Sequence, residues 1–539
     1  MRTDDGAPPD TLYGLLRRGA ERWPDRTYLL TPDGVEWNWA RCVAEASAAA
    51  DILAERGVRR GDRVAVFLPN GLDWLRAWWG CVLLDATTAS LNPYFRGHLL
   101  EDLCDRLAPT AIITAGEFAD RLAGPHRRLI VDPAEFAGGR PEIGPLEQPP
   151  HPWDTCALLM TSGTTGPSKV SITTNAYLGR FTSWLGDGCG VGPDDRFLAD
   201  MPLFHLSALS GFVEMMRVGG SVALRTEPAM RDYWRTARDV CGTFAIAPGT
   251  VAQFLEAQPA STHDRDHGMR FINCSPLPAD PAGFIERFGL LGMSTSYGST
   301  ESSCSLVQTL DVPLRPGTCG VRRPGFQTRL VDEHDREVPV GQVGELIVRT
   351  DEPWVLSQGY LGDDAATVAA FRNGWFHTGD TMREDADGYF HYHDRRKDCL
   401  RRRGENISSF EVERDVRACP GVAEVACVAA PGEYGDDEVK VFLVLEHGVS
   451  LEPVELLRFL AERMPHYMVP RYYEITDELP KTPSLRVRKH LLRDRGNGPS
   501  TWDATAAGYR VTRNGLIEPG DRHPRADEPR AFGSSTVGR

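Results

Sequence analysis

Apolar residues near the start of the chain recur at helical spacing, and later ones gather in short runs. Leu12, Leu15, Leu16, Ala20 and Trp23 fall on one face of a helix that Asp10 or Thr11 can cap. Further along, segments with helical spacing alternate with short apolar runs typical of strands. We expect helices through 42–54 and 74–84 and strands at 63–70, 110–115 and 128–131. Strands that alternate with helices of this length predict α/β layers around a largely parallel sheet.

The pattern changes along the chain, and these changes divide it. Residues 133–153 form a Pro-, Gly- and Glu-rich connection, and a second α/β run follows to about Val312. We predict an α/β fold: a large N-terminal domain of layered α/β subdomains with a β-rich subdomain, and a small mobile α+β C-terminal domain. The expected bounds are 1–396 for the large domain (β-rich part about 313–396), 397–495 for the small domain, and 496–539 for a disordered tail.

Length and composition narrow the class of protein. A chain of 539 residues exceeds a single core, and 41% hydrophobic with 25% charged residues is typical of a folded, soluble protein. The net charge of −15 argues against a dedicated nucleic-acid binder. The sequence has no apolar run of membrane-spanning length and no signal segment, so we expect a cytoplasmic protein without nucleic-acid or membrane partners. The 12 cysteines include no C-x-x-C pair, which favours buried thiols over a metal site.

One loop carries the strongest chemical signal. The run Met160–Val170 follows an apolar strand and is dense in hydroxyls, glycines and a cation: Thr161, Ser162, Gly163, Thr164, Thr165, Gly166 and Lys169. Glycines let backbone amides converge on an anion, while hydroxyls and an ammonium add donors for phosphate oxygens. Ser168 and Val170 stand where a Walker loop needs Gly and Ser or Thr, so it is a different phosphate loop. A flexible turn is the alternative interpretation.

This loop resembles the phosphate loop of the adenylate-forming superfamily, which includes acyl-CoA ligases, peptide-synthetase adenylation domains and luciferases. Other motifs follow in the family's order: MPLFHLSALSG at 201–211, SYGSTES at 296–302, GELIVR at 344–349, GWFHTGD at 374–380 and DRRKDCLRRRGENIS at 394–408. The resemblance covers roughly residues 10 to 495 and is nearest the acyl-CoA ligase branch.

The resemblance implies roles for matching residues. Thr300 and Glu301 are similar to the nucleotide and Mg²⁺ contacts, and His205 to a residue of the acid pocket, for which a packed structural role is the alternative. The implied adenine and ribose contacts are Ser296, Tyr297, Gly298, Asp380 and Arg395, together with Asn273, Cys274 and Ser275, which replace the family's usual Gly-Gly-Ala.

Two departures lie in the expected small domain. Lys397 matches the family's hinge position, but Leu485 and Arg486 stand where the family has Gly and its catalytic lysine, so Arg486 is the candidate replacement. Arg403 precedes Gly404 where the family usually has two glycines at the acceptor channel. Arg403 would narrow the channel or bind another acceptor; a solvated face is the alternative.

Three functional hypotheses remain. The first is an acyl-CoA ligase using ATP, Mg²⁺ and CoA, with a small-molecule acid as partner. The second adenylates an acid or nitrite and passes it to an amine, as in diazotase-like members of specialised metabolism. The third is a non-catalytic nucleotide-binding homologue. The substrate, the choice of thiol or amine acceptor, and a homodimer are left open.

Overall fold

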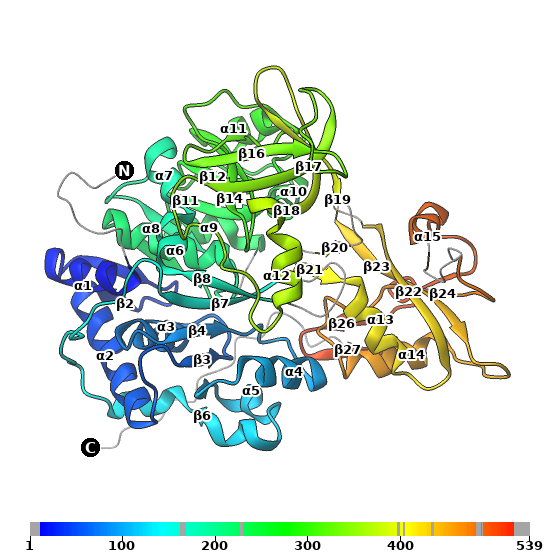
Figure 1. The fold of residues 1–539 in the computed structure, drawn as a ribbon, viewed down its shortest axis with the longest axis horizontal. Helices are drawn as coiled ribbons and strands as arrows, with labels where there is room; N and C mark the ends of the chain where they lie inside the picture. Colours follow the sequence, from blue (N-terminus) through cyan, green and yellow to red (C-terminus); the bar gives the residue numbers. More distant parts are fainter. Residues whose placement is uncertain are drawn as a thin grey trace.

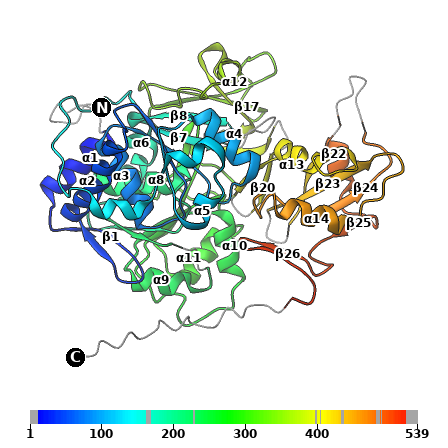
Figure 2. The same cartoon turned by 90° about the horizontal axis from the view of Figure 1, so that it is seen from below.

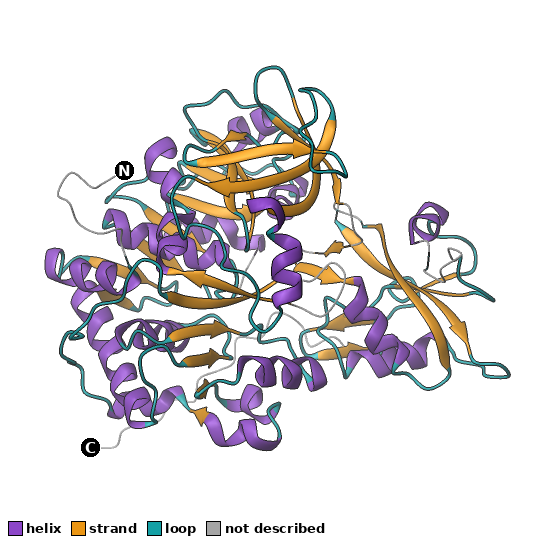
Figure 3. Cartoon of the chain, in the orientation of Figure 1, coloured by secondary structure: helices purple, strands orange, loops and turns teal. Residues whose placement is uncertain are grey.

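The computed structural model describes residues 11–161, 169–226, 230–395, 399–402, 405–432, 436–480, 487 and 489–521. Most of the chain forms a large α/β body, and the C-terminal part forms a smaller body at one end of it (Figures 1 and 2). Strands of the large body lie in sheets flanked by helices (Figure 3). The expected α/β fold, with a large N-terminal and a small C-terminal domain, is confirmed.

The first sheet has six strands in the order β6-β5-β3-β4-β7-β8. All neighbours are parallel except β7 and β8, which pair antiparallel. Its strands are β3 (Arg63–Val66), β4 (Thr87–Ser90), β5 (Ala111–Ile113), β6 (Ile130–Val131), β7 (Thr155–Thr161) and β8 (Lys169–Thr174). The helices of this region are α2 (Trp39–Glu55), α3 (Leu72–Leu83), α4 (Gly97–Leu107) and α5 (Gly116–Asp120), with 3₁₀ turns η1 (Gly124–Leu129) and η2 (Pro133–Gly138).

The second sheet has nine strands in the order β15-β14-β13-β12-β11-β9-β10-β1-β2. Its strands are β1 (Thr27–Leu30), β2 (Glu36–Asn38), β9 (Arg196–Ala199), β10 (Ser221–Leu224), β11 (Phe244–Pro248), β12 (Phe271–Ser275), β13 (Gly292–Ser299), β14 (Ser303–Gln308) and β15 (Val321–Arg322). The central strands are parallel, and β2, β14 and β15 pair antiparallel at the edges. Its helices are α1 (Leu12–Arg22), α6 (Asn175–Phe181), α7 (Ser183–Cys189), α8 (Leu206–Val218), α9 (Tyr233–Asp239), α10 (Gly249–Ala257) and α11 (Pro281–Phe288), with η3 (Met230–Asp232).

Alternating side chains of the strands enter different cores. In β3, Val64 packs into the large core shared by the two sheets, whereas Ala65 faces the core under α4. In β9, Phe197 joins the shared core, whereas Leu198 packs with residues of α9 and α11. Because successive strand residues point to opposite faces, both sheets are covered on both sides. The shared core therefore holds the two sheets together.

The β-rich subdomain is an antiparallel sheet in the order β16-β17-β18-β19. Its elements are β16 (Phe326–Val331), β17 (Val343–Thr350), α12 (Asp364–Ala370), η4 (Arg372–Gly374), β18 (Phe376–Glu384) and β19 (Phe390–Arg395). Leu306 of β14 packs with its core, so this sheet is joined to the edge of the nine-stranded sheet.

The small domain begins with a two-stranded hairpin and continues as a mixed sheet in the order β22-β23-β24-β25. Its elements are β20 (Cys399–Arg402), β21 (Glu405–Ser408), α13 (Ser409–Arg417), β22 (Val422–Pro431), β23 (Asp437–Leu445), α14 (Pro453–Ala461), β24 (Tyr472–Ile475) and α15 (Lys489–Arg495). Its core is separate from that of the large domain. The hinge proposed at Lys397 lies outside the described residues.

The expected disorder of the tail is wrong for its first part. Residues 496–521 carry β25 (Thr501–Asp503), which pairs with β24, and a hairpin of β26 (Arg510–Thr512) and β27 (Gly515–Ile517). Trp502, Tyr509, Val511 and Leu516 pack against the small-domain core. This segment has few apolar residues, and they pack against a core that other parts of the chain form. Periodicity within the segment does not reveal such packing. Residues 522–539 lie outside the described part.

Within the described residues, none of the helices combines the length and hydropathy needed to cross a membrane.

Candidate active site

The end of β13 and the turn after it carry several of the predicted site residues. Gly298 sits where a Cβ would come within 2.1 Å of the Ser303 carbonyl oxygen, so the close approach of β13 and β14 requires glycine. In the turn, the Ser302 hydroxyl accepts from the Ser299 amide at 3.0 Å, and the Ser299 hydroxyl accepts from the Glu301 amide at 3.2 Å. Local side-chain hydrogen bonds therefore shape the turn that presents Thr300 and Glu301.

The Glu301 carboxylate is connected to Lys169 through a tyrosine that the sequence analysis missed. The Tyr360 hydroxyl donates to Glu301 Oε1 at 2.8 Å, and the Lys169 Nζ lies 4.4 Å from the centre of the Tyr360 ring. Burial, and then the Glu301 charge, raise the pKa of Tyr360 well above its ordinary value, so the hydroxyl stays protonated and donates. Tyr360 reaches this place because residues 357–361 pair with β8.

The backbone of the same turn is anchored by side chains of α6 and of β8. The Tyr177 hydroxyl donates to the Thr300 carbonyl at 3.0 Å, and the Ser171 hydroxyl lies 3.4 Å from the same oxygen. Ser171 also donates to the Ser357 hydroxyl at 2.8 Å, and the Ser357 amide donates to the Glu301 carbonyl at 3.0 Å. These contacts join β8, the turn after β13 and the 357–361 segment into one rigid unit.

Tyr297 and Asp380 are in direct contact across the boundary with the β-rich subdomain. The Tyr297 hydroxyl donates a short hydrogen bond to Asp380 Oδ2. Asp380 lies on β18, is only 4% exposed, and stands opposite Arg395 in the β18–β19 register. The Arg395 side chain lies outside the described residues. The predicted ribose residue Asp380 and adenine residue Tyr297 are thus brought together.

Asn273, Cys274 and Ser275, which replace the Gly-Gly-Ala of the family, lie at the end of β12, next to β13, which carries Tyr297. Ser275 bonds to the β13 backbone through its hydroxyl, which donates to the Ser296 carbonyl at 2.7 Å and accepts from the Ser296 amide at 3.1 Å. The Asn273 amide donates to the Ser294 hydroxyl at 3.1 Å, and Cys274 is fully buried. Asn273 and Ser275 therefore tie β12 to β13 by side-chain hydrogen bonds.

His205 lies in the loop between β9 and α8. Asn70, which the sequence analysis missed, holds that loop: its amide donates to the Met201 carbonyl at 3.0 Å, and its carbonyl accepts from the Leu203 amide at 2.8 Å. His205 Nε2 lies 3.1 Å from Glu405 Oε2 on the small domain. The histidine thus meets the β20–β21 hairpin.

Several predicted residues lie outside the described part of the chain, so their geometry is not given: Ser162, Gly163, Thr164, Thr165, Gly166, Lys397, Arg403, Gly404 and Arg486. The ends of the phosphate loop are described. Thr161 on β7 and Lys169 on β8 are cross-strand partners. The strand pair therefore brings the two ends of the loop together beside Tyr360.

The described side chains near Glu301 can be tested for their fit to a magnesium ion bound together with ATP. Glu301 Oε1 accepts from Tyr360, and no hydrogen bond or ion pair to a described residue engages Glu301 Oε2. A carboxylate oxygen is a ligand that Mg²⁺ prefers, and such an ion usually takes its other ligands from phosphates and water. No cluster of three acidic, His or Cys side chains suited to a metal occurs among the described residues. The single carboxylate fits a cation shared with a triphosphate.

Comparisons with known proteins identify the family to which the chain belongs. The pattern of the family described as AMP-binding enzyme matches residues 16–361, and that of the AMP-binding enzyme C-terminal domain matches residues 411–486. Crotonobetaine/carnitine–CoA ligase of Salmonella arizonae is 28% identical over 491 residues, which cover 85% of this chain and 93% of that protein.

Solved structures show the same fold. A double mutant of o-succinylbenzoate-CoA synthetase from Bacillus subtilis, bound with its product analogue, matches with a TM-score of 0.78 at 24% identity, covering 91% of this chain and 99% of that one. The same synthetase in complex with AMP matches with a TM-score of 0.65 at 25% identity, again covering 91% and 99%. With both family patterns matched in order, this chain belongs to the AMP-binding enzymes, the adenylate-forming superfamily near its acyl-CoA ligases, and is an ATP-dependent adenylate-forming ligase.

Proposed function

We propose that this enzyme adenylates a small carboxylic acid with ATP and Mg²⁺ and transfers the acyl group to CoA. One observation carries the proposal. Lys169, Glu301 and Asp380 come from three separate elements, and Tyr360 and Tyr297 link them into one site. A nucleoside triphosphate requires a cation for its phosphates, a carboxylate for its metal ion and a carboxylate for its ribose hydroxyls. Lys169, Glu301 and Asp380 would supply these groups in that order.

In the proposed first step, an oxygen of the acid attacks the α-phosphorus of ATP, and the bond from that phosphorus to diphosphate breaks. Negative charge grows on the transferring and leaving groups, so fixed cations and donors lower the barrier. Lys169 and the donors of the 161–169 loop would bind phosphate oxygens, and Glu301 would hold the metal ion. Asp380, oriented by Tyr297, would accept from the ribose hydroxyls.

In the second step, the thiolate of CoA attacks the acyl carbon, and AMP leaves. Two observations support this acceptor. Two relatives that match most of the chain are crotonobetaine/carnitine–CoA ligases. In addition, Glu405 of the β20–β21 hairpin meets His205, so the segment assigned to the acceptor channel reaches the side assigned to the acid. Here His205 would line the acid pocket.

The test is a half-reaction assay. The protein is incubated with ATP, Mg²⁺ and a panel of acids that includes nitrite, and diphosphate release is followed with CoA, an aryl amine or neither acceptor. Mass spectrometry then identifies the product. We expect acid-dependent diphosphate release and a thioester. If the product is an amide, or a compound formed from nitrite and the amine, the acceptor is the amine and not CoA. If no acid supports ATP turnover, the proposal is rejected.

Glu301→Gln provides the matched loss-of-function variant. The amide keeps the size of the side chain but removes the charge for the metal ion, so we expect diphosphate release to fall by about a hundredfold. Glu352→Gln is the control, because Glu352 forms an ion pair with Arg180 outside the proposed site. Equal activity of the two variants would contradict the role of Glu301.

A further inference from the structure

The last described segment of the chain contacts both domains. We call residues 501–521 the C-terminal strap; it comprises β25, β26 and β27. The strap begins beyond residue 486, where the match to the family's C-terminal domain ends. It is therefore an addition to the two domains that the family pattern covers.

The strap is fastened firmly to the small domain. β25 extends the small-domain sheet by pairing with β24. Asp503 accepts from Arg471 through two hydrogen bonds of 3.0 Å, and Glu518 accepts from Arg458 of α14 through two of 2.7 Å. Two-pronged arginine–carboxylate pairs fix both distance and orientation. The strap therefore moves with the small domain.

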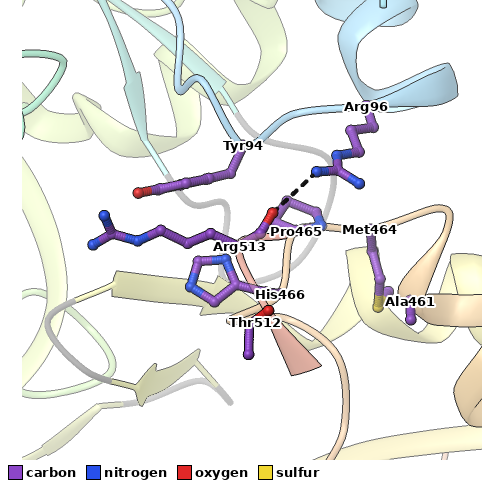
Figure 4. A pocket seen from close by; sticks show the side chains of 8 residues that line it. All are labelled: Tyr94, Arg96, Ala461, Met464, Pro465, His466, Thr512 and Arg513. Atoms are coloured by element: carbon purple, nitrogen blue, oxygen red, sulfur yellow. Dashed lines mark hydrogen bonds between the residues drawn. The ribbon is translucent and has the colours of Figure 1, made fainter. Parts of the chain in front are cut away.

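The tip of the β26–β27 hairpin lies on the large domain (Figures 2 and 4). The Arg513 guanidinium lies 5.6 Å from the centre of the Tyr94 ring, within the range of a cation–π contact. The Arg96 guanidinium donates to the Arg513 carbonyl at 3.4 Å. Tyr94 and Arg96 belong to the loop between β4 and α4, so the strap crosses from one domain to the other.

The same corner holds direct contacts between the domains. The Asn92 amide donates to the Tyr467 hydroxyl at 2.9 Å, and the Tyr94 ring packs edge-on against His466 at 4.9 Å. Nearby, His98 of α4 lies 2.7 Å from Asp415 of α13. Thr512 and Arg513 of the strap line one small cavity with Tyr94, Arg96 and His466 of this corner (Figure 4). The contacts of the strap add to an interface that exists only while the two domains keep this orientation.

This orientation presents one part of the small domain to the large domain and turns another away. The β20–β21 hairpin reaches His205 through Glu405. In contrast, α15 lies on the side of the small domain away from the large one (Figure 1). Lys489 at its start bonds to Ser409 at 2.7 Å and to Glu413 at 2.6 Å, within the small domain. The hairpin assigned to the acceptor channel therefore faces the proposed acid site.

We propose that the C-terminal strap is a latch that favours this domain orientation and so favours acyl transfer over adenylation. The inference rests on the proposed function for the identity of the two steps. The latch itself rests only on contacts between the strap and the loop that joins β4 to α4.

The test compares two arginines of one hairpin. Arg513→Ala removes the cation over Tyr94. Arg510→Ala is the matched control, because the Arg510 side chain is exposed and makes no hydrogen bond or ion pair with another side chain of the described residues, while its backbone pairs with Ile517 of β27. Hydrogen exchange of the full-length, unliganded protein is measured for a peptide covering 92–98. We expect about threefold faster exchange in Arg513→Ala and wild-type exchange in Arg510→Ala.

A kinetic measurement assigns the latch to a step. The adenylate is formed first in single-turnover experiments, and its transfer to CoA is then timed separately. Arg513→Ala should slow transfer by about threefold while adenylation stays at the wild-type rate. Glu518→Gln, which frees the hairpin from Arg458, should act in the same direction. Unchanged exchange of 92–98 in both variants, or an equal loss in both half-reactions, overturns the proposal.

The two proposals fail in different ways. If no acid supports ATP turnover, the proposed function fails and the exchange measurement still decides whether the latch exists. If turnover is normal and the exchange of 92–98 is the same in Arg513→Ala and Arg510→Ala, the latch fails alone.

Discussion

At the scale of single residues, Tyr360 does two things with one side chain. Its hydroxyl donates to Glu301, and its ring lies beneath the Lys169 ammonium. The aromatic face attracts the cation, while the hydroxyl orients the carboxylate. Tyr360 therefore contacts a positive group with its ring and a negative group with its hydroxyl.

The variant Tyr360→Phe tests this role. It keeps the ring and the buried volume but leaves Glu301 without its donor, so we expect kcat/KM for ATP to fall by about tenfold, as for loss of a hydrogen bond to a charged group. Diphosphate release at varied ATP measures the effect. Tyr389→Phe is the control, since the Tyr389 hydroxyl donates to the Pro313 carbonyl at 3.0 Å in the β-rich part. The role is refuted if both variants keep wild-type kcat/KM.

At the scale of elements, the ends of β9 and β10 bury a charged pair. Asp200 follows β9, Arg225 follows β10, and they are 6% and 3% exposed. Burial raises the pKa of the Asp200 carboxyl to about 6, with Arg225 opposing part of the rise. Among the described residues, Arg225 Nη1 and the Tyr233 hydroxyl have no hydrogen-bond partner. The site's loop at 201–205 follows directly.

This pair predicts how stability depends on pH. In the unfolded chain the pKa of an aspartate is about 4, so between pH 4 and 6 the folded state binds more protons, and its stability falls as the pH rises. Asp200→Asn removes that titration. Relative to wild type, its free energy of unfolding should therefore increase by about 2 kcal/mol from pH 4 to 7. Urea unfolding at several pH values measures the difference.

Asp332→Asn is the control for this series. Hydrogen bonds, led by that from the Arg336 backbone amide, lower the pKa of Asp332 to about 2, so both folded and unfolded carboxylates are largely ionised above pH 5. The difference between this variant and wild type should stay nearly constant from pH 5 to 7. The same flat profile in Asp200→Asn would show that Asp200 has an ordinary pKa.

At the scale of the whole molecule, the two domains have separate cores, and the small domain contains a buried ion pair. Lys440 and Glu474 are each 1% exposed, and Lys440 Nζ lies 2.7 Å from Glu474 Oε2. Lys440 also donates to the Thr501 hydroxyl of β25 at 3.0 Å. The pair thus joins the sheet of the small domain to the first strand of the strap.

Glu474→Gln should unfold the small domain selectively. Removing one charge leaves the other buried, which costs about 3 kcal/mol. We expect a lower melting transition for the small domain and faster hydrogen exchange in β22–β24, with β9–β13 unchanged. Glu446→Gln, at an exposed position after β23, is the control. Faster exchange in both domains together would show that they unfold as one unit.

The local features of the fold follow from local sequence patterns. The helix near Leu12 was predicted from its apolar face and forms as α1, and the helix predicted at 74–84 forms as α3, Leu72–Leu83. The strand predicted at 63–70 is shorter, since β3 ends at Val66. The resemblance to the adenylate-forming superfamily implied Tyr297, Glu301 and Asp380 as site residues, and the fold brings Tyr297 into contact with Asp380.

Other partners could not be read from spacing along the chain. Tyr360 meets Glu301 across 59 positions, and Glu405 meets His205 across 200. Periodicity and motifs report what neighbouring residues do, because chain geometry limits each residue to a few local conformations. Contacts between distant segments depend on how sheets and domains pack. The chemistry available to the site was therefore visible in the amino acids, whereas the partners of each group and the place of the strap arose from packing.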